Sequence, residues 1–307
     1  MGVGEGLPGG QKRRAQVAAP RPALRCNDSP PRATLVASGL LSRRRRRLLR
    51  VLRMQRSSLP GSRFLPSYDI AGPKIRIGVV CFGVALWALW VTPVGASLLY
   101  GSVAAVGGLQ CAQAWRRQRH WSPLPVVGVT AFGCPFVALL GLRAWGIYLV
   151  AVLVGIVAVT VATRTSWAER TSTTLRCGLP IGMAAASIVL TRGDARSVAI
   201  VLLVFVSAYE VGDYLVGSGA ATPLEGPAAG MIAVGVLTFA VSIIEPAPFT
   251  TSQLWVLGTV VAAACPLGQV AGSALLPSGG AFAPALRRLD SLLVAGPAYL
   301  LVTSLQR

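Results

Sequence analysis

The stretch Leu276–Leu301, LPSGGAFAPALRRLDSLLVAGPAYLL, leads from a Pro/Ser/Gly/Gly turn through two arginines to an aspartate at the start of an apolar run. That aspartate, Asp290, is one of only ten acidic residues among 307. The run after it is long enough to lie in lipid, where an unpaired carboxylate is costly. A second stretch, SAYEVGDYLVGSGAATPLEGPAAG, contains three more of the ten: Glu210, Asp213 and Glu225. We therefore expect the rest of the chain to be an apolar frame that brings the two stretches together.

The composition predicts an all-α, polytopic integral membrane protein. Hydrophobic residues make up 53% of the chain and charged residues 13%, with a mean hydropathy of +0.63, whereas soluble domains carry about a quarter charged residues. A transmembrane helix needs roughly 20 residues. The chain contains nine apolar segments, most of about this length, so we expect about nine transmembrane helices, with eight or ten still open. The 177–190 run is short for a span, and we expect it to be tilted, extended or re-entrant. The predicted segments are 75–92, 93–114, 124–142, 144–162, 177–190, 197–216, 227–244, 252–271 and 289–305.

The N-terminal residues 1–74 are predicted to be a disordered basic tail, ahead of a membrane domain formed by residues 75–307. Residues 1–76 contain 17 lysines and arginines against three acids, and a Gly/Pro/Ser/Arg-rich segment cannot bury enough apolar surface to fold alone. Leu40–Arg56 could form a basic helix on an anionic membrane surface. The basic excess adjoins the first apolar segment, so we expect a membrane partner and no nucleic acid. Met54 is an alternative start to Met1.

Deleting residues 1–53 is expected to leave folding and membrane insertion intact, because nothing in that segment can form a core. The measurement is the yield of monodisperse, membrane-extracted protein for the truncated and full chains. A truncated chain that fails to insert or aggregates on extraction would show that the tail packs against the membrane domain.

Cysteine and histidine usage indicates no zinc site and no disulfide framework. The six cysteines are scattered, with no CxxC pair, and cysteine in apolar runs behaves as a small hydrophobe. His120 is the only histidine, and one imidazole cannot make a histidine-rich metal site.

Arginine placement predicts the orientation in the plasma membrane. With the N-terminus in the cytoplasm, the cytoplasmic loops carry eight arginines: Arg116, Arg117, Arg119, Arg164, Arg170, Arg176, Arg287 and Arg288. The opposite face carries four: Arg143, Arg192, Arg196 and Arg307. This topology places the four acids of the two stretches at the cytoplasmic face, where soluble nucleotides and metal ions are met.

Each polar feature of the two stretches has a functional and a structural interpretation. Glu210 and Asp213, at i and i+3, share a helix face and could hold a divalent cation, or pair with loop arginines and end the helix. The nearby glycines, such as Gly212, could admit a ligand or pack helices. The Ser278–Gly280 turn could bind phosphate through backbone N–H groups. Arg287 and Arg288 could grip phosphate or set topology.

Together these residues resemble the phosphatidate cytidylyltransferase (CDP-diacylglycerol synthase) family. YEVGDYLVG resembles the family's Asp-Thr-Gly-Ala-Tyr-x-x-Gly, with a glutamate for the aspartate; the positions in register are Glu210, Gly212, Tyr214 and Gly217. LEGPAAG resembles the Trp-Glu-Gly stretch through Glu225, Gly226 and Gly230. LPSGGAFAPALRRLDSLL resembles the C-terminal signature through Pro277, Gly279, Gly280, Arg288, Asp290 and Ser291.

The resemblance implies a polytopic enzyme that joins CTP to phosphatidate and releases diphosphate, with Mg²⁺ as cofactor, in phospholipid biosynthesis. Carried over residue by residue, it implies that Glu210, Asp213 and Asp290 hold the metal and that Arg288 neutralises the diphosphate. Glu225 and Gly226 would order the nucleotide, together with Gly279 and Gly280. Asp290 and Arg288 would be the catalytic pair. A homodimer is compatible with this interpretation.

Departures from the family's pattern support an alternative function. Pro266 stands at the position of one family aspartate and Arg287 at another, and the Pro-Lys-Lys-Thr lysines are absent. Phosphoryl transfer with two metals depends on such carboxylates. The alternative is a catalytically inactive relative that binds lipid or a partner membrane protein. An unrelated transporter, with the acids as an ion relay, would predict an inverted repeat, and none is evident.

Overall fold

The structure, a computed structural model, describes residues 74–118, 124–163, 167–278 and 281–306. All of these belong to one compact unit, delimited as Ser57–Arg307. Residues 1–73 of the predicted tail, including Met54, lie outside the described residues, as does His120. The described part contains no strand, and its elements are α2 (Lys74–Val91), α3 (Pro93–Arg116), α4 (Leu124–Ala138), α5 (Leu142–Thr163), α6 (Trp167–Asp194), α7 (Arg196–Gly217), α8 (Glu225–Ile244), α9 (Thr251–Leu275), η2 (Leu286–Arg288) and α10 (Leu292–Leu305).

The prediction of an all-α protein is confirmed for the described residues, and each predicted segment coincides with one of these helices. Within the described ranges, five helices are long and apolar enough to cross a membrane: α3, α6 from Ser172, α7, α8 and α9. The apolar parts of α2, α4 and α5 are shorter, so the number of nine spans stays a prediction.

Of the alternatives for the short 177–190 run, the structure shows extension, because α6 has 28 residues. The helix begins ten residues earlier, in the more polar Trp167–Arg176. Once a helix is nucleated, each added residue gains a backbone hydrogen bond whether or not its side chain is apolar. The helix therefore continues beyond the apolar run that marks it in the sequence.

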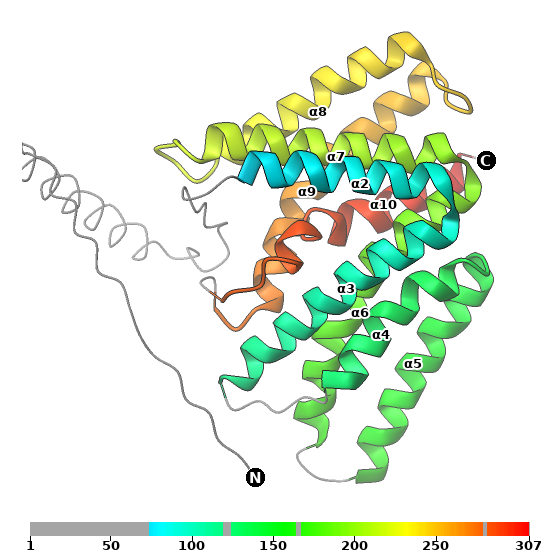
Figure 1. Cartoon of the computed structure of the whole chain (residues 1–307), viewed down its shortest axis with the longest axis vertical. Helices are drawn as coiled ribbons and strands as arrows, with labels where there is room; N and C mark the ends of the chain where they lie inside the picture. The colour runs from blue at the N-terminus through cyan, green and yellow to red at the C-terminus, as the bar shows by residue number, and fades with distance from the viewer. Residues whose placement is uncertain (1–73, 119–123, 164–166, 279–280, 307) are drawn as a thin grey trace, which may run out of the picture. The chain divides into compact units, whose positions relative to one another are not determined.

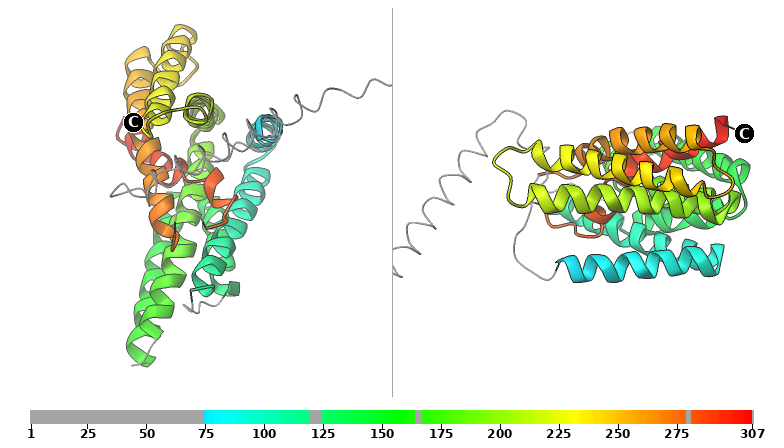
Figure 2. Two further views of the ribbon diagram at one scale, coloured as in Figure 1. Left: turned by 90° about the vertical axis from the view of Figure 1, so that its left-hand side faces the viewer. Right: turned by 90° about the horizontal axis from the view of Figure 1, so that it is seen from above.

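Helix α6 is the centre of the bundle and packs against α3, α4, α5, α7 and α10 (Figure 1). Helices α7, α8 and α9 form a second group in which α8 lies on the outside, packed on α7 and α9 (Figure 2). Helix α2 is held at its C-terminal end by two arginines. Arg192 Nε donates to the Leu89 carbonyl at 2.6 Å, and the Arg196 guanidinium lies 5.9 Å from the Trp90 ring centroid. Cations at a helix C-terminus are favourable.

Two glycines of the Ser207–Gly230 stretch allow α7 and α8 to pack closely. A Cβ at Gly230 would lie 2.7 Å from the Tyr209 ring, and one at Gly212 would lie 2.8 Å from the Ala229 carbonyl oxygen. Small residues let helix backbones approach in a membrane, where packing replaces the hydrophobic driving force. Of the two interpretations of Gly212, the structure therefore shows helix packing.

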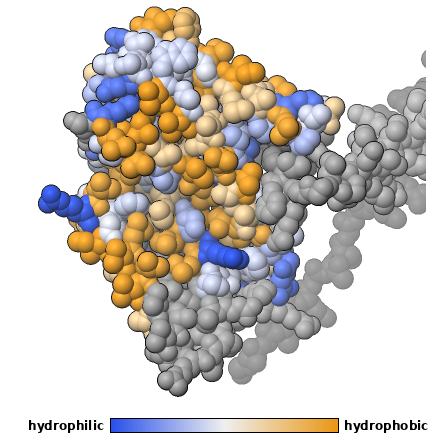
Figure 3. All heavy atoms as spheres, turned by 180° about the vertical axis from the view of Figure 1, so that it is seen from behind, coloured by the Kyte–Doolittle hydropathy of each residue, from blue (hydrophilic) through white to orange (hydrophobic). Residues whose placement is uncertain are grey.

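The outer surface is strongly apolar, as expected for helices that face lipid. Large hydrophobic side chains are exposed along α2, α5 and α8, and apolar residues cover broad areas of the face seen in Figure 3. In a molecule with an apolar surface, buried polar side chains are the exception and need hydrogen-bond partners. The buried ones on α7, α9 and the segment before α10 define the candidate site below.

Candidate functional site

The two stretches that the sequence singles out meet where α7, α9 and the Leu286–Ser291 turn come together. The turn packs directly against the backbone of α9, because Gly268 and Gly272 have no side chain to hold it away. A Cβ at Gly268 would overlap the Asp290 carbonyl oxygen and lie 2.7 Å from that of Ser291. A Cβ at Gly272 would lie 2.6 Å from Asp290 Cβ. The approach of the turn thus depends on two missing side chains one helical turn apart.

Asp290 is buried, with 6% of its surface exposed, and it is paired. Its Oδ2 lies 3.6 Å from Arg287 Nη1, and its Oδ1 accepts a hydrogen bond of 2.8 Å from the Ser291 N–H. Arg287 Nη1 also donates to Ser273 Oγ on α9 at 2.9 Å. The turn is therefore fixed by an internal ion pair that is itself tied to α9.

Asp213 is the second buried acid, with 4% of its surface exposed. Its Oδ2 accepts a hydrogen bond of 2.8 Å from Gln269 Nε2, and Gln269 Oε1 accepts one of 3.2 Å from the Tyr209 hydroxyl. A buried carboxylate needs such partners, because burying a charge without them is expensive. Gln269 therefore joins α9 to two side chains of α7.

Glu210 is the third acid of the site and is partly buried. Its carboxyl interacts electrostatically with Asp290, Arg288 and Asp213, and it lies within reach of the Ser291 side chain. Arg288 is exposed, and a Cβ at Gly78 of α2 would lie 4.0 Å from its Nη1. The structure thus brings together Glu210, Asp213, Asp290 and Arg288 of the predicted site and adds Arg287. We call these five residues the polar cluster.

Glu225 lies apart from this arrangement. Its carboxylate accepts hydrogen bonds from the Thr222 N–H and hydroxyl and from the Ala221 N–H, at 2.8 to 3.2 Å. Glu225 therefore stabilises the loop that precedes α8. Its negative charge at the start of the helix is also favourable, because it complements the helix dipole. Gly226 is buried in the first turn of α8. Gly279 and Gly280 lie outside the described residues.

The polar cluster is not a ready-made cation site. The described ranges contain no group of three or more His, Cys, Asp or Glu side chains placed to hold a metal ion. Asp290 is already ion-paired with Arg287, and one carboxylate oxygen of Asp213 already accepts a hydrogen bond from Gln269. A Mg²⁺ ion held by Glu210, Asp213 and Asp290 together stays a prediction that needs these side chains to rearrange.

Sequence reasoning missed two residues that contact the polar cluster: Gln269, which is bonded to Asp213, and Ser273, which is bonded to Arg287. Both lie in the apolar α9, and a glutamine within a membrane span is a signal of a buried hydrogen bond. That signal was present in CPLGQVAGSA, but only tertiary contacts show which acid the glutamine meets.

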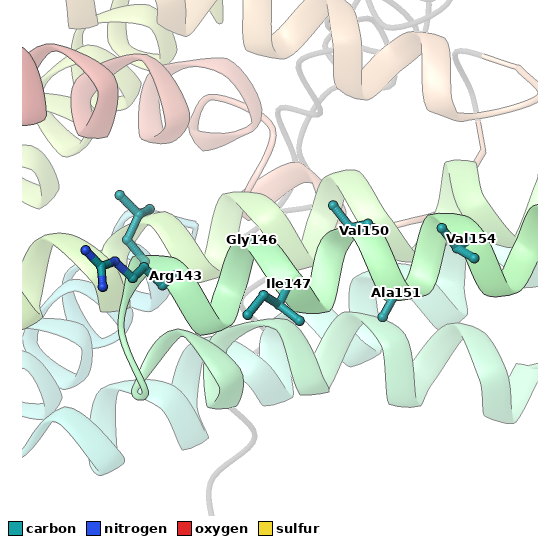
Figure 4. A pocket seen from close by; sticks show the side chains of 7 residues that line it. Arg143, Gly146, Ile147, Val150, Ala151 and Val154 are labelled. Carbon is teal, nitrogen blue, oxygen red and sulfur yellow. The ribbon is translucent and has the colours of Figure 1, made fainter.

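A shallow concave surface elsewhere among the described residues has no comparable chemistry. Its lining comes entirely from α5, with Arg143 as the only charged side chain among Leu142, Arg143, Gly146, Ile147, Val150, Ala151 and Val154 (Figure 4). A single helix face with no opposing wall is a lipid-facing surface and not a ligand pocket.

Comparisons with protein-family models, with curated proteins and with solved structures give no match to this chain. The site therefore has to be interpreted from its own geometry and from the residues quoted above.

Proposed function

We propose that this chain is a polytopic membrane protein of the phosphatidate cytidylyltransferase type, whose polar cluster binds phosphate groups of CTP and of an anionic lipid such as phosphatidate. The observation that supports the proposal most directly is the convergence of three acids and two arginines from segments about 80 residues apart. Buried ionisable groups in membrane proteins are costly and mark function by default. Guanidinium groups are favoured partners of phosphate.

The proposal includes a topology. All nine helices α2–α10 would cross the plasma membrane with the N-terminus in the cytoplasm, as the arginine distribution favours. Helices alternate in direction in this arrangement, so the end of α7, the end of α9 and the start of α10 share the cytoplasmic side. The polar cluster would then lie near the cytoplasmic surface, within reach of a soluble nucleotide and of lipid headgroups in the inner leaflet.

In the proposed reaction, an oxygen of the lipid phosphate attacks the α-phosphorus of CTP, and diphosphate leaves as the bond to the β-phosphate breaks. Arg288, the exposed cation of the cluster, would contact the diphosphate, and Asp290 would position the reacting groups. Mg²⁺, where bound, supplies charge neutralisation for the phosphates. Arg287 would have to leave Asp290 or contact phosphate itself, so we expect any CMP transfer to be slow.

A second function is favoured by the ion pair Arg287–Asp290. Arg287 stands at a position where the resembled family has an aspartate, and it neutralises Asp290 in place of a metal ion. Electrostatic stabilisation of phosphoryl transfer would therefore be weak. The chain would then be a non-catalytic relative that binds an anionic lipid, or a partner membrane protein, through the same cluster.

One assay separates the two functions. Purified protein is incubated with phosphatidate, Mg²⁺ and radiolabelled CTP, and CDP-lipid is measured beside binding of CTP. We expect turnover several orders of magnitude below that of a family member with the complete motif, because two carboxylates and the lysines are missing. If turnover is near that of such an enzyme and is lost in Asp290→Asn, the expectation that the missing residues slow the reaction is contradicted. Phosphatidate binding with neither turnover nor CTP binding would leave the lipid-binding function.

A further inference from the structure

Helix α3 contacts both ends of the segment that joins α9 to the Leu286–Ser291 turn. At the first end, the Leu275 carbonyl accepts a hydrogen bond of 2.8 Å from Trp115 Nε1 and one of 3.4 Å from Cys111 Sγ. At the second end, the Ala285 N–H donates to Gln110 Oε1 at 2.9 Å. Cys111 and Trp115, four residues apart, are neighbours on one face of α3, and Gln110 directly precedes Cys111.

The contacts at both ends satisfy groups that a helix end leaves unpaired. The last carbonyls of an α-helix have no intrahelical donor, and the first N–H groups of a helix have no intrahelical acceptor. Leu275 is the last residue of α9, and Ala285 is the N-cap of η2, with no side-chain cap of its own. Helix α3 thus caps the end of one element and the start of the next.

Backbone packing and a stacked arginine hold α3 in this position. A Cβ at Gly107 would lie 3.3 Å from the Leu286 N, so α3 approaches the turn closely there. The Arg176 guanidinium lies 6.0 Å from the centroid of the Trp115 ring, a cation–π distance. The close approach at Gly107 and the contact of Arg176 with Trp115 therefore both hold this part of α3 against its neighbours.

The two capped positions flank the ion pair of the polar cluster. Leu275 lies two residues after Ser273, which accepts the hydrogen bond from Arg287, and Ala285 lies two residues before Arg287. Phosphate recognition by arginine depends on the placement of the guanidinium. We propose that Gln110 and Trp115 are positioning residues that fix Arg287 and Asp290 for a phosphate-bearing ligand; this rests on the proposed function.

The test combines hydrogen exchange with ligand binding on the full-length protein in detergent. Gln110→Ala removes the acceptor for the Ala285 N–H, and Gln110→Glu keeps an acceptor at the same position. Trp115→Phe removes the donor and keeps a ring over which Arg176 can stack. Gln113→Ala is the matched control, because Gln113 is exposed on the same helix. The ligand probe is phosphatidate in mixed micelles with an uncharged detergent.

We expect Gln110→Ala to accelerate amide exchange in residues 285–291 about 5- to 10-fold and to weaken phosphatidate binding by a similar factor, the effect of one hydrogen bond. Trp115→Phe should weaken phosphatidate binding in the same direction. Gln113→Ala should behave as the wild type in both measurements, and Gln110→Glu should keep the slow exchange of the wild type, which a general loss of stability would not reproduce.

Three results would overturn the proposal in different ways. Unchanged exchange in Gln110→Ala would show that α3 does not fix the turn, whatever the binding data. Faster exchange with unchanged phosphatidate affinity would show a purely structural contact. Absence of phosphatidate and CTP binding by the wild type would overturn the proposed function and the ligand role together, while the exchange data would still decide whether α3 fixes the turn.

Discussion

Gly268→Ala is expected to lower the free energy of unfolding by about 1–3 kcal/mol or more, the usual cost of overpacking. The new methyl group would overlap the Asp290 carbonyl oxygen and lie 2.7 Å from that of Ser291. Both are backbone atoms, so no side chain can rotate away, and the whole turn must move. Thermal unfolding in detergent, followed by size-exclusion chromatography, measures the loss.

Gly235→Ala in α8 is the matched control. A Cβ there would meet nothing within 4 Å, and replacing a helix glycine by alanine gains up to about 1 kcal/mol of helix propensity. We therefore expect unchanged or higher stability. Equal effects of the two substitutions would show that the close contact of the turn with α9 is not what stabilises this part of the fold.

Arg287→Ala should destabilise the protein by on the order of 3 kcal/mol, because removing Arg287 from a partly buried ion pair leaves the charge of the buried Asp290 uncompensated. Asp290 has 6% of its surface exposed, and its Oδ2 lies 3.6 Å from Arg287 Nη1. The same substitution removes the hydrogen bond to Ser273. Chemical unfolding of the purified protein measures the difference.

Arg288→Ala is the control, since Arg288 is exposed and exposed ion pairs contribute at most about 1 kcal/mol. A double-mutant cycle isolates the pair: in an Asp290→Asn background, Arg287→Ala should cost clearly less than in the wild type. If the cost is the same in both backgrounds, the arginine stabilises the fold through contacts other than Asp290.

The sequence by itself determined the class of fold and the location of the unusual chemistry. The length of each apolar run indicates which segments form helices, because backbone N–H and C=O groups in lipid must form hydrogen bonds within their own segment. The scarcity of acids made Glu210, Asp213 and Asp290 visible, since each is costly in such a frame. Both signals are local, so they can be read without knowing how the helices pack. Glu225 carried the same signal, yet its carboxylate only closes its own loop.

Only the tertiary structure decided which partners these acids have. Arg287 is three residues from Asp290 and could have been paired with it from sequence, but Gln269 lies 56 residues from Asp213. Gln110 lies 175 residues from Ala285. Such contacts depend on how closely the helices approach, and that is set by where Gly212, Gly230, Gly268 and Gly272 face a neighbour. The sequence contains those glycines, but a glycine that faces a backbone and one that faces lipid are indistinguishable until the helices are packed.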